Sequence, residues 1–253
     1  MTSLQVSWPP ALDGALALVA GSSPAIGSFL APDVRSWLAS PEQSLTAAAE
    51  SVCGADATAE ALARLAPSRL TVVATVSGEH ACWAELVRSG VGAPETCIAG
   101  VTCNAAGQVS RLVWLRAPFV PASALDAERA APDGRPILER YFAELMGSRF
   151  DEAAARFTAD TIYSHPPYRG GTVRVLFRGQ EALRRGFVTE RGPSPARQVI
   201  TALWQRHGRV FVEGVVEGIE DGGSFFSTAE ITSVGEIARY VAFYSARRIR
   251  EVA

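Results

Sequence analysis

The chain has 253 residues, of which 48% are hydrophobic and 20% charged, with a formal net charge of −2. This composition is typical of a folded globular protein and excludes disorder over most of the chain. The nearly balanced charge provides no basic surface for nucleic acid or for anionic lipid, so we expect neither a nucleic acid nor a membrane as partner.

The basic residues limit the kinds of reaction that the chain can catalyse, because all 24 of them are arginine. Without lysine, a Schiff-base enzyme and a phosphate-binding loop that ends in Gly-Lys-Ser/Thr are both excluded. The cysteines have neither Cys-x-x-Cys spacing nor a histidine at zinc spacing, so we expect reduced thiols, no metal and no cofactor. The first residues lack a signal-peptide pattern, and together with the reduced thiols this predicts a cytoplasmic protein.

The first half of the chain predicts helices followed by strands. An apolar helical stretch covers residues 11–20, and Ser23-Pro24 is typical of the start of a second, short helix. A strand is expected to end near Trp37, and a further helix covers 59–65. The Ala- and Pro-rich segment that follows this half reads as a linker.

The second half predicts the same order of elements. A helix begins at Pro136, and hairpin signals such as His207-Gly208 separate the later strands. The remaining elements are a short helix at 151–156, a strand at 157–165, a helix at 180–187, and strands at 198–206, 209–217, 224–232 and 235–245.

The two halves also match in sequence. Leu18 and Leu145 start similar stretches 127 positions apart, and the segments 107–114 and 235–242 are similar at an offset of 128. Two matches at nearly one offset indicate an internal duplication. We therefore predict an α+β protein with a first domain at 1–117, a linker at 118–134 and a second domain at 135–253.

Four motifs of the second half carry a family resemblance: Tyr-Phe-x-x-Leu, Phe-Thr-Ala-Asp-x-x-Tyr-x-His-Pro-Pro, Arg-Gly-Gln-Glu-Ala-Leu and Gly-Glu-Ile-Ala-Arg-Tyr. This half resembles the SnoaL-like and nuclear transport factor 2-like superfamily, and the first half resembles it more weakly. The resemblance implies two cone-shaped domains, each a curved antiparallel sheet wrapped around helices with a pocket at the wide end. Such domains commonly pair, so we expect an intramolecular pseudo-dimer, and we leave a homodimer open.

The resemblance also implies positions for the chemistry. Ketosteroid isomerases of this superfamily use a tyrosine in the first helix, an acid before a proline in the first strand, and a second acid on a later strand. In this chain the tyrosine position holds Tyr141, the position before the proline holds His165, and the later acid position falls near Ser227. One position is kept, one is replaced by another base, and one is lost.

The replacement still suits proton transfer. A histidine with its ordinary pKa of ~6.5 accepts a proton near neutral pH. A tyrosine hydroxyl donates a hydrogen bond to a developing enolate oxygen. His165 and Tyr141 are therefore candidate catalytic residues, although a strand-end histidine and a core tyrosine explain them equally well. Strand alternation and residue type add candidate substrate-binding residues: Tyr163, Tyr240, Tyr244, Glu213, Glu230, Ser227 and Trp204.

The first copy looks degenerate, because Gly14 stands at the tyrosine position and Trp37 at or beside the histidine position. The sequence thus favours a cofactor-independent cyclase or isomerase that acts on an oxygenated small molecule, with polyketides as one candidate class. The alternative is a non-catalytic ligand-binding or scaffold protein with the same pocket. An epoxide hydrolase is less favoured, since no aspartate lies at a suitable strand position.

Overall fold

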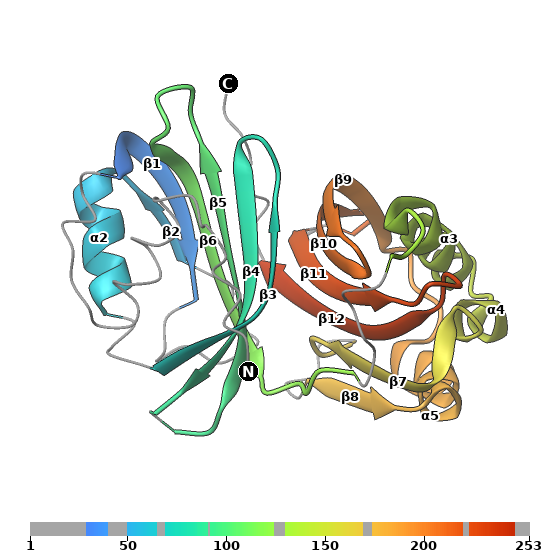
Figure 1. Ribbon diagram of the computed structural model, residues 1–253. Coiled ribbons are helices and arrows are strands. Elements are labelled where there is room, and N and C mark those ends of the chain that lie inside the picture. Colours follow the sequence, from blue (N-terminus) through green and yellow to red (C-terminus); the bar gives the residue numbers. More distant parts are fainter. Residues whose placement is uncertain are drawn as a thin grey trace, which may run out of the picture. The chain divides into compact units, whose positions relative to one another are not determined.

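The computed structural model describes residues 29–39, 50–64, 69–90, 92–123, 130–168, 174–219 and 223–245. The chain divides into two compact units, and the main boundary between them lies between Arg116 and Ala117. Among the described residues, each unit contains one six-stranded sheet, with α2 beside the first sheet and the other helices beside the second. Figure 1 shows the two sheets. The predicted α+β class is confirmed, whereas the predicted pairing of the two copies and the limits of the linker stay predictions.

The first unit has the strand order β2-β1-β6-β5-β4-β3. One helix, α2 (Ala55–Ala63), packs against β1. The predicted helices at 11–20 and after Ser23, and the predicted site position Gly14, lie outside the described residues. The strands are β1 (Leu30–Leu38), β2 (Glu50–Cys53), β3 (Arg69–Ser77), β4 (Ala81–Ser89), β5 (Glu95–Cys103) and β6 (Val109–Pro118).

The second unit repeats this arrangement with the order β8-β7-β12-β11-β10-β9. Its helices are α3 (Gly134–Met146), α4 (Phe150–Ala154) and α5 (Gln180–Gly186), and α5 continues as a π-helix at Phe187–Arg191. Figure 1 shows the long strands of this unit as a curved sheet. The strands are β7 (Phe157–His165), β8 (Val175–Arg178), β9 (Arg197–Arg206), β10 (Arg209–Glu217), β11 (Ser224–Ile231) and β12 (Ile237–Ser245).

The sheets differ from the prediction in two ways. They are mixed rather than wholly antiparallel, because β1 pairs with β6, and β7 with β12, in parallel. The short strands β2 and β8 were not expected, since four-residue strands carry little periodic signal. The first and last strands of each copy are therefore neighbours, which brings the ends of the copy together in one sheet.

Helix α3 supplies one side of the second unit's core. Asp133 caps the helix, its carboxylate accepting a hydrogen bond from the backbone N–H of Arg135 at 3.0 Å. The next apolar residues follow the helical spacing i, i+3, i+4 and i+7, which gathers them on one buried face. They are Leu138, Tyr141, Phe142 and Leu145.

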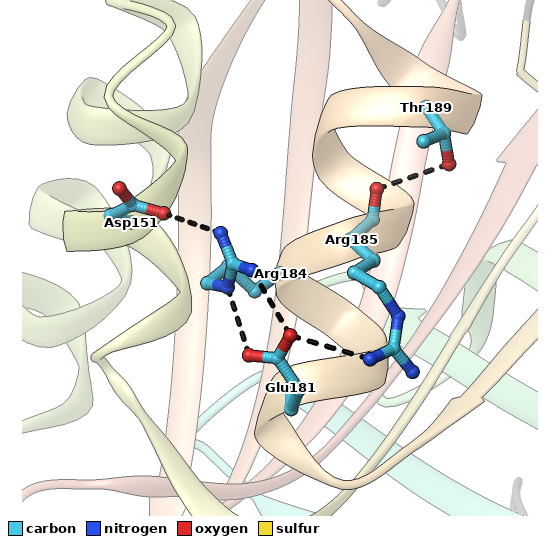
Figure 2. Close-up of polar contacts among 5 residues, drawn as sticks. All are labelled: Asp151, Glu181, Arg184, Arg185 and Thr189. Carbon is cyan, nitrogen blue, oxygen red and sulfur yellow. Dashed lines mark hydrogen bonds and ion pairs between the residues drawn. The ribbon is translucent and has the colours of Figure 1, made fainter.

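Helix α5 is anchored through both its buried and its exposed faces. Leu183 and Phe187 are buried in the core of the unit. On the exposed face, the Arg184 guanidinium contacts the carboxylates of Glu181 at 2.9 Å and of Asp151, on α4, at 3.2 Å, as Figure 2 shows. Exposed ion pairs add little stability, so the buried side chains are what hold the helix and the π-helix after it.

Candidate functional site

A cavity of about 570 Å³ opens in the second unit. Its volume is in the range of small-molecule sites. Among the residues that the structure describes, five polar ones line it: His165, Tyr168, Arg191, Ser194 and Gln198. The other described lining residues are apolar and rich in proline: Leu145, Pro166, Pro167, Pro193, Pro195, Ala196, Val216 and Ile219.

One continuous segment builds much of this wall. The π-helix ends at Arg191, where the backbone N–H of Gly192 bonds the carbonyl of Phe187 at 2.9 Å. Gly192 has φ 57°, a left-handed conformation that glycine adopts without strain. The turn sends the chain into the Pro-Ser-Pro sequence at 193–195 and then into β9. A π-turn of this kind is frequent at functional sites.

His165 is the last residue of β7 and faces the cavity. Its ring stacks on that of Tyr168, with centroids 4.3 Å apart and an interplanar angle of 18°. The His165 ring also lies nearly parallel to the ring of Tyr163, and the centroids of these two rings are 6.1 Å apart. The Pro-Pro turn after β7 brings Tyr168 back over the histidine, and this pairs the two aromatic rings.

The surroundings of His165 keep it neutral. Burial, together with the positive charges of Arg174 and Arg191, lowers the pKa of His165 to about 3, although its hydrogen bond to Pro166 opposes the shift. The Nδ1 atom lies 2.7 Å from the carbonyl oxygen of Pro166. Because a carbonyl only accepts, Nδ1 carries the proton, and Nε2 is then the nitrogen with the lone pair.

A chain of three tyrosine hydroxyls leads from the core to the cavity. The hydroxyls of Tyr141 and Tyr163 are 3.1 Å apart, and those of Tyr163 and Tyr168 are 2.9 Å apart. Tyr168 lines the cavity, whereas Tyr141 is fully buried and does not. The hydroxyl next to the cavity is therefore that of Tyr168, with Tyr141 at the far end of the chain.

The far end of this chain lies in an aromatic core. Burial raises the pKa of Tyr141 well above its ordinary value, and burial also raises that of Tyr163. Tyr240, on β12, stacks on Tyr163 at 5.3 Å and meets Tyr141 edge-on at 5.7 Å. The raised pKa values keep the phenols of Tyr141 and Tyr163 protonated. Tyr141, Tyr163 and Tyr240 hold the chain of hydroxyls in place and are not among the residues that line the cavity.

Three of the predicted lining residues lie on the opposite face of the sheet. Side chains alternate along a strand. Glu213 follows the core residue Val212, Glu230 lies between two core residues, and Trp204 follows Leu203, which packs on the core. The alternation turns all three away from the aromatic core, and none lines the cavity.

Glu230 has a structural role on that face. Its carboxylate accepts a hydrogen bond from Arg209 at 2.7 Å and lies 3.7 Å from the guanidinium of Arg239. It also accepts hydrogen bonds from the backbone and hydroxyl of Ser123, while Arg239 donates to the carbonyl of Pro121. This cluster fixes the segment before α3 against the sheet.

The last two predicted positions are on β11 and β12. Ser227 is buried on the core face, where its backbone pairs with Val212 on one side and Ala242 on the other, and it is not among the lining residues. The backbone of Tyr244 pairs with Phe225, and its side chain lies outside the described part of the structure.

The first unit has different residues at the corresponding positions. Strand pairing equates Ser36 with Tyr163 and Leu38 with His165, so neither a tyrosine nor a histidine faces that core. Trp37 lies on the other face of the strand, under the guanidinium of Arg111. His80 is exposed next to Glu79.

An ion cluster occupies the place that corresponds to the cavity wall. Arg88 corresponds to the lining residue Val216, and it bonds the Glu95 carboxylate at 3.0 Å. Arg116 bonds the same carboxylate through two nitrogens. Burial raises the pKa of Glu95, but the hydrogen bonds and charges of Arg116 and Arg88 outweigh it and hold the pKa below its ordinary value.

Sequence reasoning missed Tyr168 and Arg191. Tyr168 follows two prolines, and no strand period predicts where a side chain points after such a turn. Arg191 comes directly before Gly-Pro-Ser-Pro, and this Gly/Pro-rich loop was a usable signal for a cavity rim.

Among the residues that the structure describes, no group of three or more His, Cys, Asp or Glu side chains is arranged to hold a metal ion. No helix in the same part of the chain is long and apolar enough to span a membrane.

The second unit thus has a curved sheet with helices, as the family resemblance implies, and the described part of the first unit has the same strand order. No protein-family model and no curated protein matches the chain. Solved structures do resemble it. A protein of Kribbella flavida, provisionally named a ketosteroid isomerase, is 18% identical and covers 47% of this chain and 82% of its own, with a TM-score of 0.36.

Two further solved structures show the same kind of similarity. A protein of Sinorhizobium meliloti, provisionally named a polyketide cyclase, is 17% identical over 42% of this chain and 93% of its own, with a TM-score of 0.35. An NTF2-like protein of unknown function from Cytophaga hutchinsonii is 12% identical over 44% and 89%, with a TM-score of 0.34. Their names are those of the superfamily that the motifs resemble, and similarity at this level assigns no activity.

Proposed function

We propose that the second unit is a cofactor-free isomerase or cyclase that removes a proton next to a carbonyl group of an oxygenated small molecule. The observation that carries this proposal is the pairing of His165 and Tyr168 at one cavity, with ring centroids 4.3 Å apart. A base and a hydrogen-bond donor beside a common space are what enolate formation needs.

The residues divide the step between them. Nε2 of His165 takes the proton from the carbon next to the carbonyl, and the electrons of the broken C–H bond form the carbon–carbon double bond of an enolate. The hydroxyl of Tyr168 donates to the oxygen that becomes negative. In an isomerisation, His165 then returns the proton to another carbon of the enolate system. In a cyclisation, the enolate carbon attacks a second carbonyl, and the proton passes from His165 to the oxygen of that carbonyl to give an alcohol.

The tyrosine chain strengthens this donor. Hydrogen bonds in a row polarise one another, so Tyr141 and Tyr163 make Tyr168 a better donor when they donate along the chain. Their burial fixes the geometry before the substrate arrives. Tyr141 is then a positioning residue, and Tyr168 takes the oxyanion role for which the sequence suggested Tyr141.

Ligand binding without catalysis is the second candidate. The low pKa of His165, about 3, favours this second candidate. A base this weak lowers the activation barrier to proton removal only a little. Catalysis then depends on Tyr168 to stabilise the enolate, whereas a binding protein needs only the shape of the cavity.

Deuterium exchange separates the two candidates without knowledge of the natural substrate. The full chain is incubated in D2O with 2-tetralone and a panel of cyclic enones, and loss of the proton signals next to the carbonyl is followed by NMR. We expect exchange above the buffer rate, background exchange in His165→Ala, and a loss of about 100-fold in Tyr168→Phe, the size typical of a lost oxyanion donor.

The matched control is His80→Ala, which removes an exposed histidine of the first unit and should leave the rate unchanged. Saturable ligand binding without exchange would establish the binding protein instead. Exchange that persists in His165→Ala would exclude His165 as the base.

A further inference from the structure

Arg174 comes directly before β8 and contacts the two strands beside the candidate base. Its Nε atom donates to the hydroxyl oxygen of Ser164, on β7, at 2.8 Å. Its Nη2 atom donates to the carbonyl oxygen of Ala242, on β12. The guanidinium also lies over the ring of Phe243, 5.5 Å from the ring centroid. One side chain thus joins β7 to β12.

This connection lies where the pairing of the two strands ends. In the described sheet, β7 and β12 pair as far as Ser164 and Val241. His165 and Ala242 are the next residues of the two strands, and Arg174 bonds the carbonyl of Ala242. The guanidinium therefore ties the strands together next to the histidine, at a point where the strand pairing no longer does so.

The guanidinium and the imidazole lie on opposite faces of the sheet. Ser164 alternates with His165 along β7, and His165 faces the cavity. Phe243 alternates in the same way with the core residue Ala242 along β12. Arg174 therefore supports the histidine from behind, and it is not among the described residues that line the cavity.

The position is unfavourable for a charged side chain. Burial lowers the pKa of Arg174 to about 9, although the neighbouring phenols of Tyr163 and Tyr168 oppose the shift. The hydrogen bonds to Ser164 and Ala242 go to neutral oxygens, which offset less of the desolvation cost than a carboxylate does. A guanidinium held here at a cost in free energy points to a role beyond stability.

The first unit has other residues at all of the corresponding positions. Leu38 takes the place of the histidine, and Trp37 takes the place of the serine. Strand β2 begins opposite Leu38 as β8 begins opposite the histidine, so Ala49, the residue before β2, takes the place of the arginine in the sequence. The arginine and its acceptor therefore occur in the unit that has the histidine.

We infer that Arg174 is a positioning residue, which ties the end of β7 to β12 and thereby holds the His165 ring at the cavity. A catalytic base has to be held to within about 0.5 Å by such supporting contacts. The inference rests on the proposed function for its activity readout, whereas its NMR readout needs no reaction.

The test replaces Arg174 by glutamine, which removes the charge and the guanidinium fork. Deuterium exchange of 2-tetralone is measured with the full chain over a range of ketone concentrations. We expect the maximal rate to fall about 10-fold, because a small displacement of the base is costly. The half-saturating concentration should stay within about 2-fold, since the arginine holds the base and not the ligand.

Nitrogen NMR reports the position of the histidine directly. In the wild-type protein, the proton of His165 should be on Nδ1, which faces the carbonyl of Pro166. In Arg174→Gln, we expect a mixture with the form that is protonated on Nε2, because the displaced ring no longer keeps that hydrogen bond. A purely structural role would lower the free energy of unfolding and leave this tautomer unchanged.

Ser164→Ala removes the acceptor of the tie on β7 and serves as a second variant. It should lower the exchange rate in the same direction but less, because the bond to Ala242 remains. The double variant should be no slower than Arg174→Gln alone, since both changes break one connection.

Arg178→Gln is the matched control, because Arg178 is an exposed arginine at the other end of β8. It should leave the rate and the tautomer unchanged. An unchanged rate and tautomer in Arg174→Gln, or fully additive losses in the double variant, would overturn the inference. If Arg174→Gln does not fold, the rate and the tautomer of Ser164→Ala decide.

The two proposals fail separately. If the wild-type protein gives no exchange, the enzyme is rejected, and the tautomer of His165 in Arg174→Gln still tests the tie. Exchange that requires His165 but is the same in Arg174→Gln, with the tautomer unchanged, would retain the enzyme and reject the role of Arg174.

Discussion

His165 owes its neutral state to its place at the end of β7. Burial disfavours the imidazolium, and two nearby arginines add to that effect. The carbonyl of Pro166 selects the tautomer in which Nε2 carries the lone pair. A histidine in this state is in its base form across the physiological range.

Nitrogen NMR of the histidines tests this state directly. We expect Nδ1 of His165 to be protonated and Nε2 unprotonated from pH 8 to pH 5, while exposed His80 serves as the internal reference. An imidazolium at pH 6, or a proton on Nε2, would contradict the assigned base.

The same shift links folding to pH. The pKa of His165 is lower in the folded protein than its unfolded value of ~6.5, so the unfolded chain binds the proton more readily. The contribution to stability is therefore complete above that unfolded value and is lost as the pH falls toward 3.

The sequence predicts the positions of some site residues and not of others. Alternation along β7 puts Tyr163 and His165 on one face, and both lie there. Alternation alone does not show which face of β10 and β11 is turned toward the core. It therefore could not predict that Glu213 and Glu230 point away from the core. Tyr168 and Arg191 are placed by a Pro-Pro turn and a π-helix, whose side-chain directions follow no simple period.

At the scale of elements, the five long strands of the second unit were predicted within one or two residues, because hairpin signals such as His207-Gly208 mark the ends of several of them. The parallel pairing of β7 with β12 was not predicted, since it joins segments far apart in the chain. The predicted helix 180–187 is one residue longer than α5, and the continuation of α5 as a π-helix was not predicted.

The turn after β10 is the element that closes the cavity wall. Gly218 has φ 78°, and a Cβ atom there would collide with the carbonyl oxygen of Pro195, on the lining segment. Gly218→Ala should therefore destabilise the protein by about 1–3 kcal/mol in urea unfolding, the usual cost of overpacking, and weaken the binding of 2-tetralone.

Gly235→Ala is the control, because Gly235 also has a positive φ but a Cβ there makes only ordinary contacts at 3.5 Å or more. It should cost only the strain of the left-handed backbone and leave binding intact. Equal effects of the two variants on 2-tetralone binding would argue against the role given to the 193–196 wall.

At the scale of the whole molecule, one sheet topology occurs twice with different residues at corresponding positions. The second unit has His165 and Val216 where the first has Leu38 and Arg88. In the first unit, Arg88 is tied with Arg116 to the Glu95 carboxylate. Breaking a buried ion cluster of this kind costs much free energy, because each lost partner leaves an uncompensated charge.

We therefore predict one ligand site for each chain. Calorimetric titration with 2-tetralone, the ketone used in the exchange experiment, should give a stoichiometry of one. A stoichiometry of two would show that the first unit also binds.

The most direct test of the proposed chemistry is the pH dependence of the exchange that requires His165. The quantity is the difference in deuterium exchange rate between the wild-type protein and His165→Ala, measured with 2-tetralone from pH 5 to pH 8. Because the pKa of His165 is about 3, this difference should stay constant over the range. A difference of zero, or one that falls away below pH 6.5, would contradict a buried neutral base in the cavity.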